Sequence, residues 1–316
     1  MRRLDALTLK QLKALSAVTR NGTISGAADE LGLTPPAVHS QLKSLEATLG
    51  CSLLDRSANG VFVPTAEGRA LLLANETAAA ALSKALQQID ALKRGLAGTV
   101  ILGVVSTGKY VAPSFVARLK KIFPKIDIVM SVGNRDATIA ALETRRVDLA
   151  IMGRPPRYPA VTAYPIGDHP HVLIAPPDHP LARMERASVD RILQENFILR
   201  EPGSGTRILT MRFLDQLGEG KPFTFTEMES NETIKQAVIA GLGIALISFH
   251  AVSEELKYGR LSVIRADNLP IVRKWYLLHR SDEALSGAVE TILDYITDNA
   301  HEFLDDQEFD RVVSQT

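Results

Sequence analysis

The stretch that decides the fold of the N-terminal part is TISGAADELGLTPPAVHSQLKSLEATLG, residues 23–50. Its first half predicts a short helix that ends at Gly32. Pro35 and Pro36 predict the first turn of a second helix, because the N–H group that proline lacks is not used there. The second helix is expected to end at Gly50. Two short helices joined by a tight turn form a helix-turn-helix, whose second helix enters the major groove of DNA.

The surroundings of this motif complete a small domain, assigned to residues 1–64. Helical periodicity predicts another helix over residues 9–21, and residues 53–56 and 60–63 are typical of a hairpin wing. An alternative is a three-helix structural domain whose polar face is merely solvated. The residues predicted to contact bases or phosphates are Ser25, Thr34, Pro36, His39, Ser40, Lys43 and Arg56.

Charge and composition exclude some classes of protein, but they do not by themselves indicate that DNA is the ligand. The whole chain carries 36 basic and 36 acidic side chains, and residues 1–60 have a net charge of only +2. Charge placement and self-association must therefore supply the attraction to DNA. The single cysteine, Cys51, excludes an internal disulfide and a multi-cysteine metal site, so no metal is expected. Since the sequence contains neither a membrane-length apolar run nor a signal-peptide core, we expect a cytoplasmic protein with no membrane partner.

Residues 65–95 predict one long connecting helix. Residues 65–94 contain no proline, and their only glycine is Gly68. Apolar and small residues recur at alternating spacings of four and three, with Asn75 as a polar register-setter, and this pattern is typical of a helix that pairs with a second copy. The alternative is a helix packed on its own domain. The residues predicted to dimerise are Leu71, Ala78, Leu82, Ala85, Ile89 and Leu92.

From about residue 99 the pattern changes to strands that alternate with helices. This alternation predicts α/β architecture, with parallel sheets covered by helices and a ligand site at the strand ends. The predicted strands are residues 100–105, 126–132, 147–152, 171–175, 197–199, 223–226, 244–247 and 275–278. The predicted helices are residues 112–122, 137–145, 207–217, 232–240 and 284–296.

Polar loops at the ends of these strands predict a binding site for an anion. The loops cover residues 106–110, 134–136, 153–154 and 200–207, and three of them open a helix. Freed N–H groups, helix dipoles and arginines together bind anions. For any single loop, ordinary capping and turn chemistry is the alternative. The effector-binding residues predicted from these loops are Ser106, Thr107, Lys109, Asn134, Arg135, Arg154, Glu201, Ser204, Thr206 and Arg207. Glu201 would repel an anion, so we expect it to pair with an arginine.

The N-terminal motifs resemble the LysR-type transcriptional regulators. The resemblance rests on Ser25-x-Ala27-Ala28-x-x-Leu31, on the run from Thr34 to Gly50, and on Pro64-Thr65-x-x-Gly68. It implies a winged helix-turn-helix, a long dimerisation helix and a two-lobed, periplasmic-binding-protein-like α/β effector domain over residues 96–310. Lobe I would cover about 99–168 and 270–300, and lobe II about 169–269, with the chain crossing near 167–170 and 267–271.

Within that family the C-terminal motifs are similar to the CbbR subgroup, the regulators of the Calvin-cycle (RuBisCO) operon. The matching segments are residues 105–110, 133–135, 148–156, 175–181, 200–207, 230–238 and 273–280. The resemblance implies promoter DNA, a homodimer or homotetramer, and RNA polymerase as partners. It implies no cofactor but a small anionic effector such as a sugar phosphate or NADPH, and it adds Asn231 to the effector-binding residues.

Two other classes of function are weighed against a regulator. An enzyme is not expected, because no catalytic order of nucleophile, histidine and carboxylate is apparent, and we assign no catalytic residue. A solute-binding protein would explain residues 99–296 but not the first 94. A LysR-type regulator of another metabolic operon also stays open.

Overall fold

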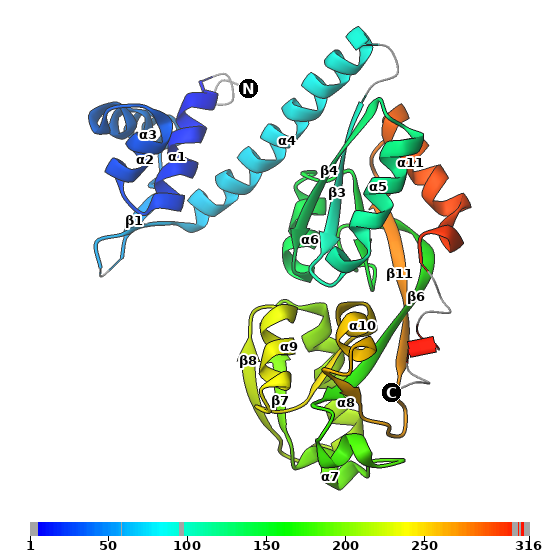
Figure 1. The fold of residues 1–316 in the computed structure, drawn as a ribbon. Helices are drawn as coiled ribbons and strands as arrows, with labels where there is room; N and C mark the ends of the chain where they lie inside the picture. The colour runs from blue at the N-terminus through cyan, green and yellow to red at the C-terminus, as the bar shows by residue number, and fades with distance from the viewer. Residues whose placement is uncertain (1–5, 58, 95–97, 305–308, 310, 313–316) are drawn as a thin grey trace. The chain divides into compact units, whose positions relative to one another are not determined.

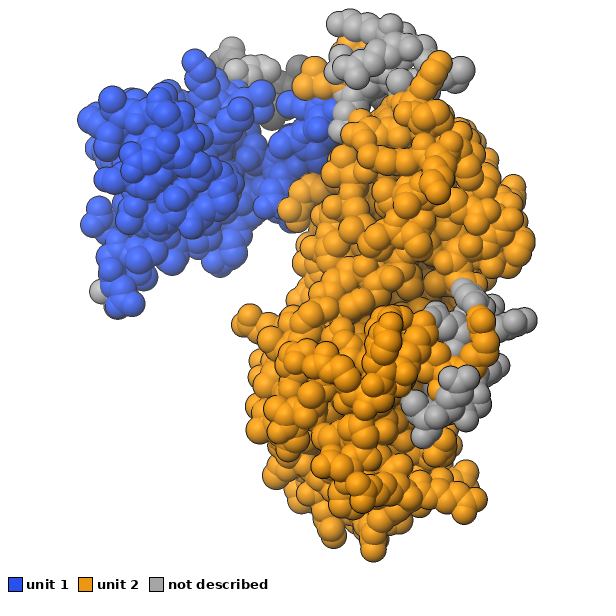
Figure 2. All heavy atoms as spheres, in the orientation of Figure 1, with its two compact units in different colours: residues 1–84 blue, residues 85–316 orange. Residues whose placement is uncertain are grey.

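The computed structural model describes residues 6–57, 59–94, 98–304, 309 and 311–312. Contacts divide the chain into two compact units, residues 1–84 and residues 85–316 (Figure 2). The elements of the first unit, including the long helix that continues into the second, are α1 Leu9–Asn21, α2 Ile24–Leu31, α3 Pro35–Leu49, β1 Leu54–Arg56, β2 Phe62–Pro64 and α4 Ala66–Arg94.

Local capping sets the ends of the first three helices. Thr8 forms a capping box with Gln11 at the start of α1. Gly22, Gly32 and Gly50 follow α1, α2 and α3 with left-handed backbones, a conformation that glycine adopts without steric cost. Thr34 occupies the N-cap position of α3, but its side chain makes no capping hydrogen bond. The predicted helix-turn-helix is confirmed.

A small apolar core holds the first unit together. Buried residues from all three helices meet there, among them Leu15, Val38 and Leu45. The wing is an antiparallel hairpin in which Arg56 pairs with Phe62, and the Arg56 guanidinium lies 4.8 Å from the centroid of the Phe62 ring. This pairing confirms the predicted wing, although Ala58 at its tip lies outside the described residues.

The second unit is built from strands with covering helices. Its strands are β3 Gly98–Val105, β4 Ile126–Gly133, β5 Leu149–Met152, β6 Val161–Ala175, β7 Asn196–Arg200, β8 Thr224–Met228, β9 Ala245–Ser248, β10 Ser262–Val263 and β11 Ile271–Arg280. Its α-helices are α5 Ala112–Ile122, α6 Arg135–Glu143, α7 Val189–Leu193, α8 Gly205–Gly218, α9 Asn231–Ile239, α10 Phe249–Lys257 and α11 Gly287–Asp298. Short 3-10 helices are η1 Gly108–Tyr110, η2 Pro180–Arg183 and η3 Ala300–Glu302. The sequence predicted neither α7 nor α10.

The parallel pairing expected from the alternation holds for part of the strands, whereas β11 pairs antiparallel with both β5 and β6. β3 pairs in parallel with β4 and β5, and β7 pairs in parallel with β8. The large sheet has the order β10-β6-β11-β5-β3-β4, with β9 also paired to β6. Two lobes result: lobe I contains β3–β5 with α5, α6 and α11, and lobe II contains β7–β10 with α7–α10 (Figure 1).

The lobes are joined by two long antiparallel strands, β6 and β11, which run side by side through both of them (Figure 1). The sequence predicted only residues 171–175 and 275–278 of these strands. Residues 167–170, where the first crossing is predicted, lie inside β6, so the chain passes between the lobes there as a continuous strand. Pro165 and Pro170 interrupt the strand pattern, because proline removes one ladder hydrogen bond and normally argues against a strand.

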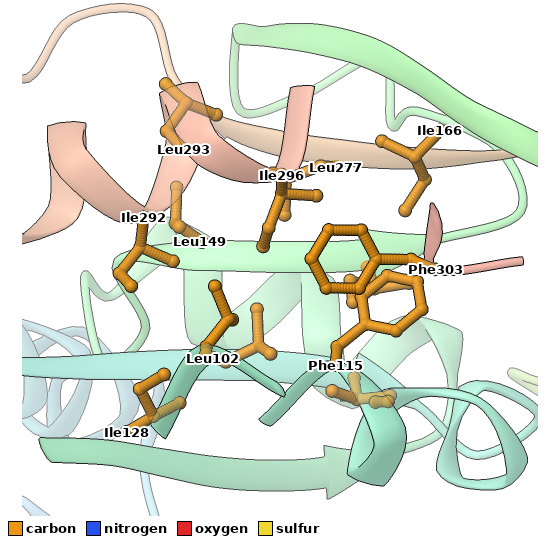
Figure 3. Packing of buried hydrophobic residues seen from close by; sticks show 14 of the residues in the cluster. Leu102, Phe115, Ile128, Leu149, Ile166, Leu277, Ile292, Leu293, Ile296 and Phe303 are labelled. Atoms are coloured by element: carbon orange, nitrogen blue, oxygen red, sulfur yellow. The ribbon is translucent and has the colours of Figure 1, made fainter. Parts of the chain in front are cut away.

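Separate apolar cores stabilise the lobes. The core of lobe I places Leu102, Phe115 and Leu149 against helix α11 and the crossing strands (Figure 3). Lobe II has two cores, one on each side of its strands, which contain Phe249 and Phe197 respectively. Each lobe can therefore keep its own packing while the strands between them bend.

The end of the chain contacts both lobes. Phe303 and Leu304 are buried in the core of lobe I, and the centroids of the Phe303 and Phe115 rings lie 4.5 Å apart. Further on, Phe309 packs at 5.1 Å, edge to face, against Phe249 in lobe II, and Val312 is buried in the same core. The last described residues thus contribute apolar contacts to both lobes.

Candidate functional site

The outer face of α3 has the geometry of a recognition surface. Val38, Leu42 and Leu45 point into the core, so the opposite side of the helix faces solvent. Within the described part of the chain, the side chains of the predicted DNA-binding residues form no hydrogen bond or ion pair. All seven are exposed: Ser25, Thr34, Pro36, His39, Ser40, Lys43 and Arg56. Helical spacing brings Pro36, Ser40 and Lys43 onto one face, as reading a groove requires.

The predicted dimerisation seam divides into two parts along α4. Leu71 packs against the core of the first unit, and the Asn75 amide donates to the Ser16 hydroxyl of α1 at 3.0 Å. These residues therefore have contacts within their own unit, which the heptad pattern did not predict. The exposed part contains Ala78, Leu82, Ala85 and Ile89. The side chain of Leu92 lies outside the described residues.

A cavity of about 510 Å³ lies between the two lobes. It is lined by residues from the ends of β3 and β5, the starts of α6 and α8, and the crossing strands. Six of the predicted effector residues line it: Ser106, Thr107, Arg135, Arg154, Ser204 and Thr206. Sequence reasoning missed other lining residues, which include Arg157, Tyr158, His169, His171, Arg212 and Arg273.

Unpaired positive charge is the main chemical property of this cavity. Five arginines line it, and no Asp or Glu among the described residues does. None of the five forms an ion pair within the described part of the chain; they are Arg135, Arg154, Arg157, Arg212 and Arg273. Burial lowers the pKa of Arg135 although Asp136 opposes the shift, and the neighbouring Arg154 and Arg212 lower it further. The cavity therefore favours a ligand with several negative charges.

The remaining predicted residues lie outside the cavity lining, and each has a hydrogen-bond or ion-pair partner within the protein. Lys109 forms an ion pair with Glu232, which also accepts a hydrogen bond from Tyr110. Arg207 donates to Glu227 and to the carbonyl oxygen of Arg200, each at 2.6 Å. Because their charges already have partners, Lys109 and Arg207 are poor candidates for direct contact with the effector.

Arg200, which the prediction placed on a loop but did not select, organises the same edge of the cleft. Its side chain is 2% exposed, and the guanidinium binds the Glu201 carboxylate through two hydrogen bonds, at 2.7 and 2.9 Å. It also donates to Asn231 at 2.6 Å and, across the cleft, to Ser106 at 3.1 Å. The expected pairing of Glu201 with an arginine is confirmed. Asn134 caps α6 and reaches Glu201 at 3.4 Å.

We call the contacts that join the lobes here the cleft latch. It consists of Lys109 and Tyr110 with Glu232, Ser106 with Arg200, and Asn134 with Glu201. Burial raises the pKa of Tyr110 well above its ordinary value, and Glu232 raises it further, so its hydroxyl is a stable donor. Most of the predicted effector residues thus belong to the cavity lining or to the latch, and Ser106 belongs to both. Arg207 and Asn231 belong to neither.

Two buried histidines form the floor of the cavity on β6. The His169 ring stacks on Trp275 of β11 with centroids 3.7 Å apart, and its Nε2 lies 3.0 Å from the Ser248 hydroxyl. Burial holds the pKa of His169 well below its ordinary value, and His171, His250 and Arg273 add to the shift. The same burial lowers the pKa of His171 to about 4. Both rings are therefore neutral at pH 7.

A periodic signal for one missed residue was present in the sequence. Gly205, Ile208, Leu209 and Arg212 follow helical spacing from the glycine-rich loop, so they share the face of α8 that lines the cavity. Arg273 could not be found in this way. It reaches the cavity because β11 pairs it with His169, and both residues lie in parts of β11 and β6 that the sequence did not predict as strand.

Other kinds of site find no support among the described residues. No group of histidine, cysteine and carboxylate side chains in that part of the chain could hold a metal ion. None of the helices formed by these described residues is both long and apolar enough to cross a membrane.

The fold and the two surfaces define a protein that binds DNA through one unit and a small ligand through the other. Residues 9–69 match the bacterial regulatory helix-turn-helix protein model of the lysR family, and residues 93–301 match the LysR substrate binding domain. The chain belongs to the LysR family of transcriptional regulators and is a DNA-binding regulator, not an enzyme.

Relatives cover almost the whole chain. It is 50% identical over 289 residues to the HTH-type transcriptional regulator CbbR of Cereibacter sphaeroides. The match covers 91% of this chain and 93% of the relative. It is 35% identical to the RuBisCO operon transcriptional regulator of Allochromatium vinosum, over 93% of this chain and 97% of the relative. The regulatory domain of Synechocystis PCC6803 CcmR in complex with 2-PG is 31% identical, with a TM-score of 0.60, over 63% of this chain and 96% of that one.

Proposed function

We propose that this regulator controls a carbon-fixation (Calvin-cycle) operon in response to an anionic metabolite bound between its lobes. The observation that carries the proposal is the cavity itself, with five arginines and no carboxylate in its described lining. The operon is inferred from relatives named CbbR and RuBisCO operon regulator. The complex of CcmR with 2-PG supports a small effector, and sugar phosphates and NADPH are further candidates.

The effector acts by changing the arrangement of the lobes. Like charges within the cavity repel one another, and an anion offsets this repulsion while it contacts residues from both lobes. A ligand that prefers one arrangement shifts the population toward it. In an oligomer this motion changes the spacing of paired DNA-binding units, and typical coupling energies are about 1–3 kcal/mol. RNA polymerase at the promoter, in the cytoplasm, is the proposed recipient of the signal.

Self-association is proposed through the exposed part of α4. Leu82 is 49% exposed and Ile89 is 47% exposed, values that a second copy would lower by packing against them. Replacing both with Lys is expected to convert a dimer or tetramer into monomers in light scattering, whereas Thr77→Ala on the same helix keeps the wild-type mass. An unchanged mass in the double variant would show that the exposed part of α4 does not hold the copies together.

DNA binding through α3 is tested by the salt dependence of affinity. Wild-type protein is titrated by fluorescence anisotropy with duplexes selected from a random-sequence library, at several salt concentrations. Lys43→Ala is expected to weaken binding to all sequences and to lower the salt slope by about one contact. His39→Ala should instead alter the preference among related duplexes. Lys125→Ala, an exposed lysine of lobe I, is the control. If the wild-type protein binds no duplex, the proposed function as a DNA-binding regulator is refuted.

Effector binding is tested separately by calorimetry. We expect wild-type protein to bind at least one of ribulose bisphosphate, NADPH, phosphoenolpyruvate and 2-PG. A ligand present at about 100 times its Kd should add about 2.7 kcal/mol to the free energy of unfolding. If none of these anions binds, the proposed class of effector is wrong even when DNA binding is intact.

A further inference from the structure

The first turns of α4 are part of the DNA-binding unit and not of a free linker. Thr65, which precedes the helix, donates its backbone N–H to the Leu53 carbonyl and its hydroxyl to the Ser52 carbonyl, both at 3.0 Å. At Gly68 an added Cβ would lie only 2.1 Å from the Leu53 carbonyl oxygen. The helix therefore starts in direct contact with the chain that leads into the wing.

Asn75 adds a contact two turns further along. Its amide donates to Ser16 of α1 at 3.0 Å, between residues 59 positions apart in the sequence. Leu71 and Leu72 pack against the domain core between these two fixed points. A helix held near its start by Gly68 and at Asn75 has a defined direction relative to α1, and α1 in turn packs on α3.

The direction of α4 matters because the seam that would join two copies lies further out. Ile89 is about 14 residues beyond Asn75, which corresponds to about 21 Å of helix. A tilt of about 10° at the docking point therefore displaces the seam by roughly 4 Å, and one base-pair step of DNA is about 3.4 Å. A small change in the direction of α4 would therefore change the distance between two recognition helices by about the length of one base-pair step.

We propose that Asn75, through Ser16, is a positioning residue that fixes the direction of α4 and so sets the spacing between the two DNA half-sites that one dimer recognises. The proposal rests on the proposed DNA binding and dimerisation. Asn75 itself does not touch DNA in this scheme. Its loss is expected to leave the reading of a single half-site intact and to relax the selection among spacings.

The test measures affinity as a function of spacing. Full-length protein first selects duplexes from a random-sequence library, which identifies two half-sites and their preferred separation. Affinity is then measured for this duplex, for duplexes with the gap lengthened or shortened by one and two base pairs, and for a single half-site. Asn75→Ala and Ser16→Ala should each reduce the preference for the selected spacing by about three- to tenfold, the range expected for one hydrogen bond.

Two controls separate positioning from general damage. Thr77→Ala removes a hydroxyl whose bond to the Leu73 carbonyl stays within α4, so it should leave the spacing profile unchanged. The exchanged pair, Ser16→Asn with Asn75→Ser, should restore part of the preference. Melting temperature and half-site affinity should stay at the wild-type level in Ser16→Ala, the milder single variant.

The outcomes are distinct. A relaxed profile with unchanged half-site affinity supports the inference. An unchanged profile in both Asn75→Ala and Ser16→Ala overturns it while DNA binding by the wild type still stands. A wild-type protein that selects no duplex overturns the proposed function, and the inference with it.

Discussion

The positive side chains around the cleft form two groups that look alike in sequence and differ in their surroundings. Lys109, Arg200 and Arg207 each have a carboxylate partner, at Glu232, Glu201 and Glu227 respectively. Arg135, Arg154 and Arg273 line the cavity without one, within the described part of the chain. Most members of both groups come from strand ends, loops and helix starts, whereas Arg273 lies within β11.

This difference assigns separate roles to the two groups. A cation that is bound bidentately by a carboxylate, as Arg200 is, contributes to the folded structure and has little charge left for a ligand. A cation without a counter-charge raises the electrostatic free energy of the unliganded protein, and an anionic ligand lowers it again. Removing members of each group should therefore give opposite results in stability and in binding.

The largest effect on stability is expected for Arg200→Ala. The substitution removes the guanidinium that binds Glu201 and the buried Asn231, and losing one member of a buried ion pair costs about 3–5 kcal/mol of unfolding free energy. Urea unfolding, followed by the fluorescence of Trp275, the only tryptophan of the chain, measures the loss.

Arg207→Ala provides the matched control for this loss. Its partner Glu227 is 44% exposed, so a change of at most about 1 kcal/mol is expected. Equal losses in Arg200→Ala and Arg207→Ala would show that burial does not distinguish these two arginines.

The largest effect on binding is expected in the other group, for Arg154→Ala and Arg135→Ala. Each should weaken effector binding by roughly 10- to 150-fold, the equivalent of about 1.5–3 kcal/mol for a hydrogen bond to a charged group. Their unliganded stability should stay within about 0.5 kcal/mol of wild type. Calorimetry and urea unfolding on the same preparations measure the two quantities.

Arg207→Ala again serves as the control, since it should keep wild-type effector affinity. If Arg207→Ala weakens effector binding as much as Arg154→Ala does, the division into two groups fails.

Much of the fold could be predicted because its determinants are local. Proline and glycine positions marked the helices of the DNA-binding unit, and helical periodicity found α5 at its observed bounds. The predicted DNA-reading face follows from the same periodicity, since the core residues Val38, Leu42 and Leu45 define the opposite side. Residues 161–170 of the crossing strand β6 were missed, because Pro165 and Pro170 oppose a strand locally and pairing with β11 overcomes that preference.

The cavity could be predicted only in part, because charge pairing is not local. The sequence showed Lys109 on a polar loop, but its partner Glu232 is 123 positions away. The same limit applies to the linker helix, where a regular heptad pattern could not reveal that Asn75 contacts Ser16. The identity of a residue at a strand end is thus visible in the sequence, whereas the counter-charge that decides its role is supplied by the fold.

The smallest effect tests the latch itself. Glu232→Gln removes the charge that Lys109 and Tyr110 contact, and because Glu232 is 48% exposed the expected loss of unfolding free energy is at most about 1 kcal/mol at pH 7. Glu254→Gln removes a carboxylate that pairs with Lys257 one turn away on the surface of lobe II, so a smaller loss of about 0.3–0.5 kcal/mol is expected there.

The pH dependence of this small difference identifies its origin. Burial would raise the pKa of Glu232, but the hydrogen bonds from Lys109 and Tyr110 outweigh burial and hold it below the ordinary value of 4.5. A carboxylate whose pKa is lowered by folding stabilises the protein fully above its unfolded pKa, and this contribution is lost as the pH falls through the folded pKa. The difference between wild type and Glu232→Gln should therefore be constant from about pH 8 to about pH 5.5 and shrink below 4.5. A difference that instead persists undiminished in acid would show that the Glu232 charge does not hold the lobes together, and that the latch depends on Arg200 and its partners alone.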